Sequence, residues 1–212
     1  MDVPQRQSAL LLALTTEHFV LQGAASATTA EAASRTSIYL LSLSSSLVAI
    51  GFASQSPSAL RPLIFTVLPV VTVLGLLTLI RLVDITSEYR QCLLGIAQIR
   101  GYYRTLGPEA AVYFATARGR WPEPGAPNPS VQLGSKVAFL TTASTMIATI
   151  NSVVFGAVVT WLARAPLGGD GLALALAIGS TAAGLLMLGF LRYQTWRFQL
   201  FDEVLPAEDV AL

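Results

Sequence analysis

The stretch LIFTVLPVVTVLGLLTLIRLV, residues 63–83, decides the fold of this chain. Its only charged residue is Arg81, near its end. A helix of this length is about 32 Å long, which matches the hydrocarbon core of a bilayer. Three further stretches are long and uncharged: residues 37–54, 137–163 and 171–191. The sequence therefore predicts four membrane spans, which makes the lipid bilayer the first expected partner.

The composition supports a membrane protein and excludes several other classes. Of 212 residues, 53% are apolar and only 12% are charged, about half the charged share of soluble proteins. The net charge of +1 gives no electrostatic footprint for nucleic acid. The single cysteine, Cys92, and the single histidine, His18, exclude an intrachain disulfide and a bis-histidine haem. We expect no metal and no cofactor.

Catalytic motifs are absent from the sequence. It contains no phosphate-binding loop, no G-x-S-x-G and no H-E-x-x-H. We therefore expect that the protein is not an enzyme. The interiors of the predicted spans also hold no ionisable side chain, which argues against proton-coupled transport. The deepest strongly polar side chain is that of Asn151.

The connections between the spans predict how they pair. Residues 55–62 and 164–170 are short and contain prolines and glycines, so each should close a hairpin. The expected fold is all-α: one unit with four transmembrane helices in two hairpins and long cytoplasmic helical extensions. The expected segments are an N-terminal cytoplasmic helix (1–36), hairpin 1 (37–83), a cytoplasmic helical segment with a Pro-rich loop (84–136), hairpin 2 (137–191) and a cytoplasmic C-terminal helix and tail (192–212).

Basic residues predict the orientation. Of the 13 lysines and arginines, only Arg61 and Arg164 lie in the short loops. The other eleven lie beside the span ends that face the termini and the central segment. By the positive-inside rule, both termini and the central segment are cytoplasmic. With twelve arginines to one lysine, as in GC-rich bacterial genomes, we expect a multipass protein of a bacterial cell (inner) membrane.

An apolar seam extends the second span into the cytoplasm. No helix breaker separates residues 63–106, so one nearly continuous helix is expected. Apolar residues recur there with the alternating spacing of three and four that is typical of a coiled coil. The seam packs either on the N-terminal and C-terminal helices of the same chain or on neighbouring subunits. Its residues are Ile85, Tyr89, Cys92, Ile96, Ile99 and Tyr103.

Residues 5–35 are expected to form a helix with an apolar face. Glu17 lies in the middle of that face. It either forms a salt bridge with a central arginine or stands at a pore mouth or regulatory site. His18 is placed with it as a candidate for the cytoplasmic mouth, although most single histidines are simply packed or solvated.

The stretch Thr15-Thr16-Glu17-His18-Phe19-Val20-Leu21-Gln22, with Ser37-Ile38-Tyr39-Leu40 further on, carries a resemblance. It resembles a group of uncharacterised actinobacterial multipass membrane proteins over most of the chain. The resemblance implies a source and a membrane fold, and it implies no activity.

Hydroxyl side chains form stripes along two spans. Such stripes either let helices pack closely or line a water-filled path. The pore-lining candidates are Ser42, Ser45 and Ser46 in the first span and Thr142, Thr145, Thr149, Asn151, Ser152 and Thr160 in the third.

Two hypotheses for the function follow from these patterns. The first is a homo-oligomeric ion channel with a hydroxyl-lined path. The second is a membrane-embedded scaffold or regulatory subunit that binds a protein partner through its cytoplasmic helices. Oligomeric state and ion flux distinguish them.

Overall fold

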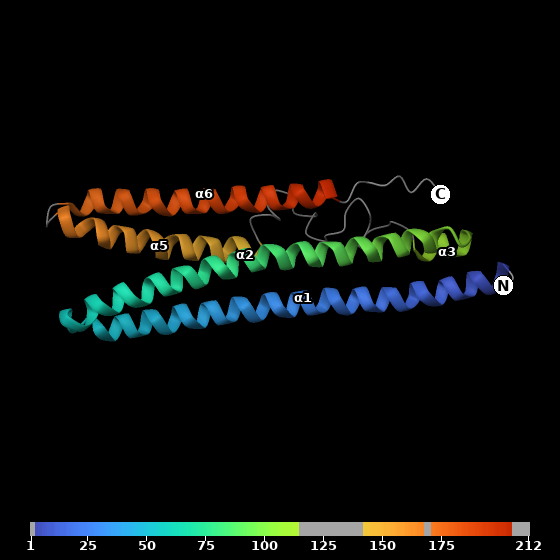
Figure 1. Ribbon diagram of the computed structural model, residues 1–212, viewed down its shortest axis with the longest axis horizontal. Coiled ribbons are helices and arrows are strands. Elements are labelled where there is room, and N and C mark those ends of the chain that lie inside the picture. Colours follow the sequence, from blue (N-terminus) through green and yellow to red (C-terminus); the bar gives the residue numbers. More distant parts are fainter. Residues whose placement is uncertain (1–2, 115–141, 168–170, 205–212) are drawn as a thin grey trace. The chain divides into compact units, whose positions relative to one another are not determined.

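The computed structural model describes residues 3–114, 142–167 and 171–204, and these residues are almost entirely helical (Figure 1). The helices are α1 (Val3–Ala53), α2 (Pro57–Arg104), α3 (Pro108–Tyr113), α5 (Ala143–Leu167) and α6 (Leu172–Val204). No strand occurs within the described ranges. The expected all-α class is confirmed.

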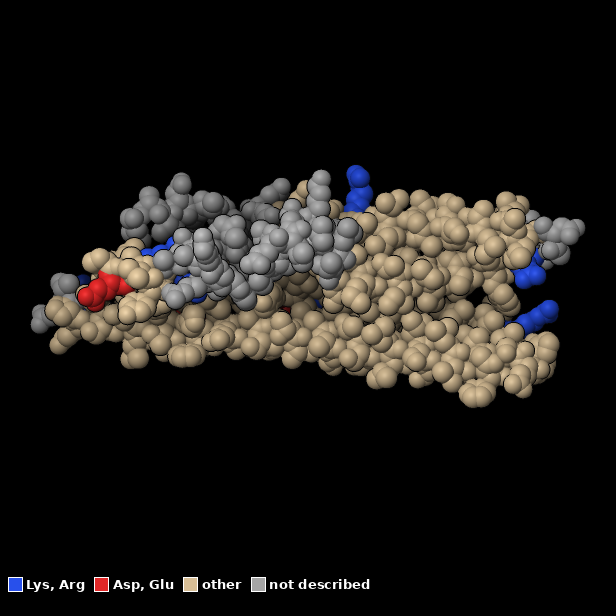
Figure 2. Space-filling model, turned by 180° about the vertical axis from the view of Figure 1, so that it is seen from behind, with Lys and Arg blue, Asp and Glu red and all other residues tan. Residues whose placement is uncertain are grey.

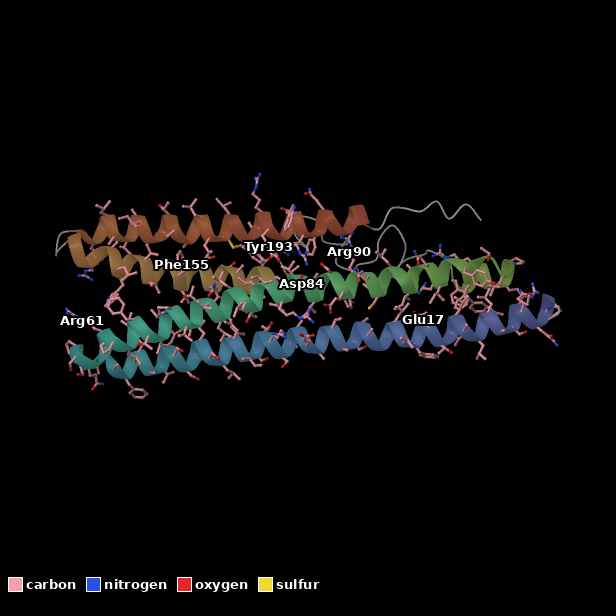
Figure 3. All side chains as sticks on the ribbon, viewed as in Figure 1. Glu17, Arg61, Asp84, Arg90, Phe155 and Tyr193 are labelled. Atoms are coloured by element: carbon pink, nitrogen blue, oxygen red, sulfur yellow. The ribbon has the colours of Figure 1, made fainter. Side chains whose placement is uncertain are left out.

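Four of these helices, α1, α2, α5 and α6, are long and apolar enough to cross a membrane. The best window of α2 has a mean hydropathy of 2.6, and that of α1, the helix with the serine-rich span, has 1.6. The stretch that predicted the fold is therefore the most apolar of the four. Figure 2 shows a broad surface without charged atoms over the apolar helices, with basic atoms at the end where Arg61 lies (Figure 3).

Several boundaries differ from the expected ones. α1 is one continuous helix, because no breaker separates the N-terminal helix from the first span. The expected loop 55–62 is shorter, since α2 begins at Pro57 and contains Pro62. Pro57 is well tolerated because it lies in the first helical turn, where the amide that proline lacks has no partner, whereas Pro62 lies in the second turn. α5 passes Arg164 and ends at Leu167. Residues 115–141, which include the expected Pro-rich loop, lie outside the described ranges.

The expected continuation of the second span into a longer helix is confirmed. α2 continues without interruption from the span into the seam. It ends before Gly107, and α3 begins at Pro108 with proline in its first turn. α6 extends beyond the expected span, to Val204.

The chain divides into two compact units, which corrects the expectation of one. Unit 1 comprises Met1–Ala32 and Asp84–Phe139, and unit 2 comprises Ala33–Val83 and Leu140–Leu212. α1 has 51 residues and is about 76 Å long, so its two halves can join separate sets of contacts. The same holds for α2 with its 48 residues.

In unit 2, small residues bring α5 and α6 close together (Figure 1). A Cβ atom added to Gly156 would lie 2.8 Å from the carbonyl oxygen of Gly179 and 2.8 Å from the Cβ of Ala183. The ring of Phe65 on α2 meets that of Trp161 edge-on, with centroids 4.5 Å apart. Close backbone approach through small residues is a common way for helices to pack in a bilayer.

In unit 1, the first half of α1 packs on the last half of α2. The Leu21 side chain lies 2.8 Å from the Cβ position of Gly95. The hydroxyls of Thr15 and Tyr103 are 3.4 Å apart. Arg104 Nε donates a hydrogen bond of 2.7 Å to the Phe114 carbonyl, which holds the residue after α3 against α2.

Candidate functional site

A polar contact inside unit 2 joins three helices. The Tyr39 hydroxyl on α1 donates to Asn151 Oδ1 on α5 over 3.3 Å, and both side chains are fully buried. Gly75 on α2 leaves the space that they occupy, since a Cβ there would lie 2.5 Å from Asn151 Cγ and 2.9 Å from Tyr39 Cε2. The sequence marked Asn151 as polar and deep, but nothing in it pointed to Tyr39 as the partner.

Most of the candidate pore hydroxyls bond within their own helix. Thr149 donates to the carbonyl of Thr145 over 2.9 Å, and Thr160 donates to that of Gly156 over 2.9 Å. On α1, Ser42 donates to the carbonyl of Ile38 over 2.8 Å, and Ser46 donates to that of Ser42 over 2.6 Å. The hydroxyls of Thr142 and Thr145 are 2.9 Å apart. A hydroxyl bonded in this way is satisfied without water.

The candidate pore residues do not share one surface of the chain. Thr145, Asn151 and Ser152 are buried inside unit 2. Thr149 and Ser45 are exposed. Large, exposed apolar side chains lie beside both residues on the same helix faces. Ser45 is flanked by Leu41 and Val48, and Thr149 is flanked by Met146 and Val153. An exposed face of this composition suits lipid better than water.

Unit 2 also contains a polar side chain that the sequence did not single out. Gln194 on α6 is fully buried, and neither its Nε2 nor its Oε1 atom has a hydrogen-bond partner among the described residues. Polar and aromatic residues alternate around Gln194 without a clear period. The sequence there does not predict which side chain is buried.

The two candidates for the cytoplasmic mouth lie on different sides of α1. Glu17 is exposed, and it forms no ion pair with the residues that the structure describes (Figure 3). One of the two alternatives for Glu17, a salt bridge to a central arginine, is therefore not found within those residues. Neighbouring residues on a helix point about 100° apart, so His18 turns inward where Glu17 does not.

His18 lines a cavity of about 420 Å³ between the parts of α1 and α2 that belong to unit 1. Its polar lining is His18, Gln22, Ser26 and Thr29 from α1 and Tyr89 and Arg100 from α2. Ala25, Leu93 and Ile96 form its apolar part. This volume lies within the range of small-molecule sites.

Half of the seam on α2 is already buried in a single chain. Ile85, Ile96 and Ile99 are each at most 6% exposed, whereas Tyr89, Cys92 and Tyr103 are partly exposed. Burial raises the pKa of the Cys92 thiol, and the charge of Glu88 raises it further, against the effect of a backbone hydrogen bond. The role of the seam in oligomerisation stays a prediction, and packing on α1 already covers part of it.

In the described residues no three His, Cys, Asp or Glu side chains are grouped so that they could hold a metal ion. No protein family, curated protein or solved structure matches the chain.

Proposed function

We propose that this chain is a multipass protein of the cell membrane and works as a homo-oligomeric scaffold or regulatory subunit. Unit 2 supplies the four membrane spans, arranged as two hairpins. Unit 1 is the cytoplasmic extension, and both termini are cytoplasmic. The distribution of arginines supports this orientation, since only Arg61 and Arg164 lie in the two short connections.

The observation that carries the proposal is an uncovered apolar face on α1 in unit 1. Leu12 is 70% exposed, Phe19 is 66% exposed and Val20 is 58% exposed. These residues are seven and eight positions apart, so they lie on one side of the helix. The opposite side of α1, which carries Leu21, already packs on α2. Outside a membrane, large apolar side chains grouped in this way indicate a binding surface.

A second copy of this chain is the proposed occupant of that face. The charged residues of the first 32 positions are Asp2, Arg6, Glu17 and Glu31, so their formal net charge is only −2. Two copies would therefore repel each other little. A symmetric contact also needs only one self-complementary patch, which is how most homodimers form.

The contacts inside unit 2 favour a scaffold over the channel predicted from the sequence. The hydroxyls of Thr149 and Thr160 are satisfied by their own helix. Gly156 is part of the contact between α5 and α6. These groups support helix packing within one chain, and no water-filled path is required to solvate them.

The test is the oligomeric state of the purified protein in mild detergent, measured by light scattering. The double variant Leu12→Ser/Phe19→Ser should shift an oligomer to a monomer. The matched control is Leu41→Ser/Val48→Ser, which changes exposed apolar residues of the first span. A wild-type monomer, or an oligomer that the first variant leaves intact, would refute the proposal. Ion flux in liposomes that Thr145→Leu alters would instead support the channel.

A further inference from the structure

The cavity in unit 1 has a lining that suits an anion. Arg100 contributes a guanidinium, which also interacts with another group of the protein, and no carboxylate is among the described residues that line the cavity. The nearest acidic neighbours in sequence are Glu17 and Glu88, which are both exposed and lie outside the cavity. A guanidinium binds anionic oxygens through charge-assisted hydrogen bonds, often two at a time.

The histidine in this cavity has an unsatisfied ring atom. His18 Nδ1 is buried and has no hydrogen-bond partner within the part of the chain that the structure describes. Buried polar atoms are rarely left in this condition, and each one calls for an explanation such as a missing ligand. A turn of the ring toward the cavity would break no existing hydrogen bond at that atom.

The number of donors favours a phosphate over a carboxylate. Gln22, Ser26 and Tyr89 add an amide and two hydroxyls to the groups of Arg100 and His18. Thr29 is less available, because its hydroxyl already donates to the Ser26 carbonyl over 2.8 Å. A phosphate monoester has three terminal oxygens to receive these donors, and a carboxylate has two. Leu93 and Ile96 offer an apolar wall for an organic group.

The place of Arg100 along α2 favours a soluble ligand over a lipid. Arg100 is 16 residues beyond Asp84, where unit 1 begins on this helix, and that corresponds to about 24 Å of helix. The polar layer on each side of a bilayer is only about 5–8 Å thick. This step rests on the proposed function, in which unit 1 is the cytoplasmic part.

We propose that this cavity binds a soluble organic phosphate of about mononucleotide size, with the phosphate held between Arg100 and His18. The organic group lies along Leu93 and Ile96. Binding at this place would let the cytoplasmic unit of the scaffold respond to a small molecule.

His18 provides a direct readout, because it is the only histidine in the chain. The protein, purified with a histidine-free tag, is labelled with ¹³C and ¹⁵N in histidine and observed by NMR in detergent micelles. Adenosine 5′-monophosphate and inorganic phosphate are the probes, and adenosine is the neutral control. We expect a saturable shift of the ring signals with the nucleotide, a weaker response to inorganic phosphate and none with adenosine.

Two variants separate the cavity from the rest of α2. Arg100→Gln should weaken nucleotide binding by about tenfold or more, because a hydrogen bond to a charged group is lost. Arg90→Gln is the matched control on the same helix and lies outside the lining. Circular dichroism establishes that both variants keep their helix content.

The outcomes decide the proposal independently of oligomerisation. No saturable shift with either phosphate probe up to millimolar concentration would overturn it, as would equal shifts with adenosine or equal loss in Arg90→Gln. A shift seen only in phosphatidylglycerol vesicles, and absent from phosphatidylcholine vesicles with nucleotide, would assign the cavity to a lipid headgroup and overturn the soluble ligand. A nucleotide response in a monomeric protein would support the cavity even if the scaffold proposal failed.

Discussion

Replacing Gly75 with alanine should destabilise the protein far more than the same change at another glycine of a span. The added Cβ would lie 2.5 Å from Asn151 Cγ and 2.9 Å from Tyr39 Cε2. Both of these side chains are fully buried, so neither can move aside into solvent. Overpacking of a tight interior costs about 1–3 kcal/mol. Loss of the hydrogen bond from Tyr39 to Asn151 adds about 0.6 kcal/mol, a typical value between membrane helices.

These two costs, less the about 0.5–1 kcal/mol by which alanine is favoured over glycine in a helix, give an expected loss for Gly75→Ala of about 1–3 kcal/mol in the free energy of unfolding. Gly184 on α6 is the matched control, because nothing lies within 4 Å of a Cβ added there. Gly184→Ala should be neutral or stabilise by about 0.5–1 kcal/mol, as usual for alanine in place of a helical glycine. Unfolding is followed by circular dichroism in mixed micelles with increasing dodecyl sulfate.

A double-mutant cycle tests the stated cause. Asn151→Ala removes the Asn151 atoms that the new Cβ meets and leaves only Tyr39 Cε2, so Gly75→Ala should cost less in that background. A coupling of at least about 1 kcal/mol is expected between the two positions. The reasoning is refuted if Gly75→Ala is as stable as Gly184→Ala, or if the two losses simply add.

Two further predictions concern groups that the sequence did not mark as unusual. Gln194→Leu should raise the free energy of unfolding by about 1–3 kcal/mol, because it removes buried amide atoms that lack partners among the described residues. Thermal unfolding measures this change, with Gln98→Leu at an exposed position as the control. A loss of stability in Gln194→Leu would contradict the prediction. Alkylation of Cys92 by a maleimide should increase with pH, because the thiolate is the reactive form and the pKa of this thiol is raised. The control is an exposed cysteine introduced by Thr105→Cys in a Cys92→Ala background, and its alkylation should reach the midpoint at a lower pH. A midpoint for Cys92 at or below that of the control would refute the prediction.

The helices and their apolar character could be predicted from the sequence because they depend on local patterns. The continuous helix through Val83 and Asp84 followed from the absence of a breaker. The start of α3 depends on an equally local pattern, since Gly107 is followed by Pro108 in a first helical turn. The error at Pro57 had a local cause too, since proline fits a first turn as well as it fits a loop.

The cavity could not be predicted, because it depends on which residues meet across two helices. His18 and Arg100 are 82 positions apart, and the register of α1 against α2 brings both to one cavity. Periodicity predicts the face of a helix but not its offset along a neighbour. The same limit hid Tyr39 as the partner of Asn151, and it left Glu17 with an expected salt bridge that the described residues do not form.

The pairing inside unit 1 also has a consequence for the order of events during synthesis. Leu21 leaves the ribosome 74 residues before Gly95, the residue that it packs against. At about 5–20 residues per second, this gap lasts roughly 4–15 s. During that time the apolar side chains of the nascent α1 lack this partner, and in the proposed orientation they are exposed to the cytoplasm. The amino-terminal half of α1 is therefore a segment that chaperone binding during synthesis would protect.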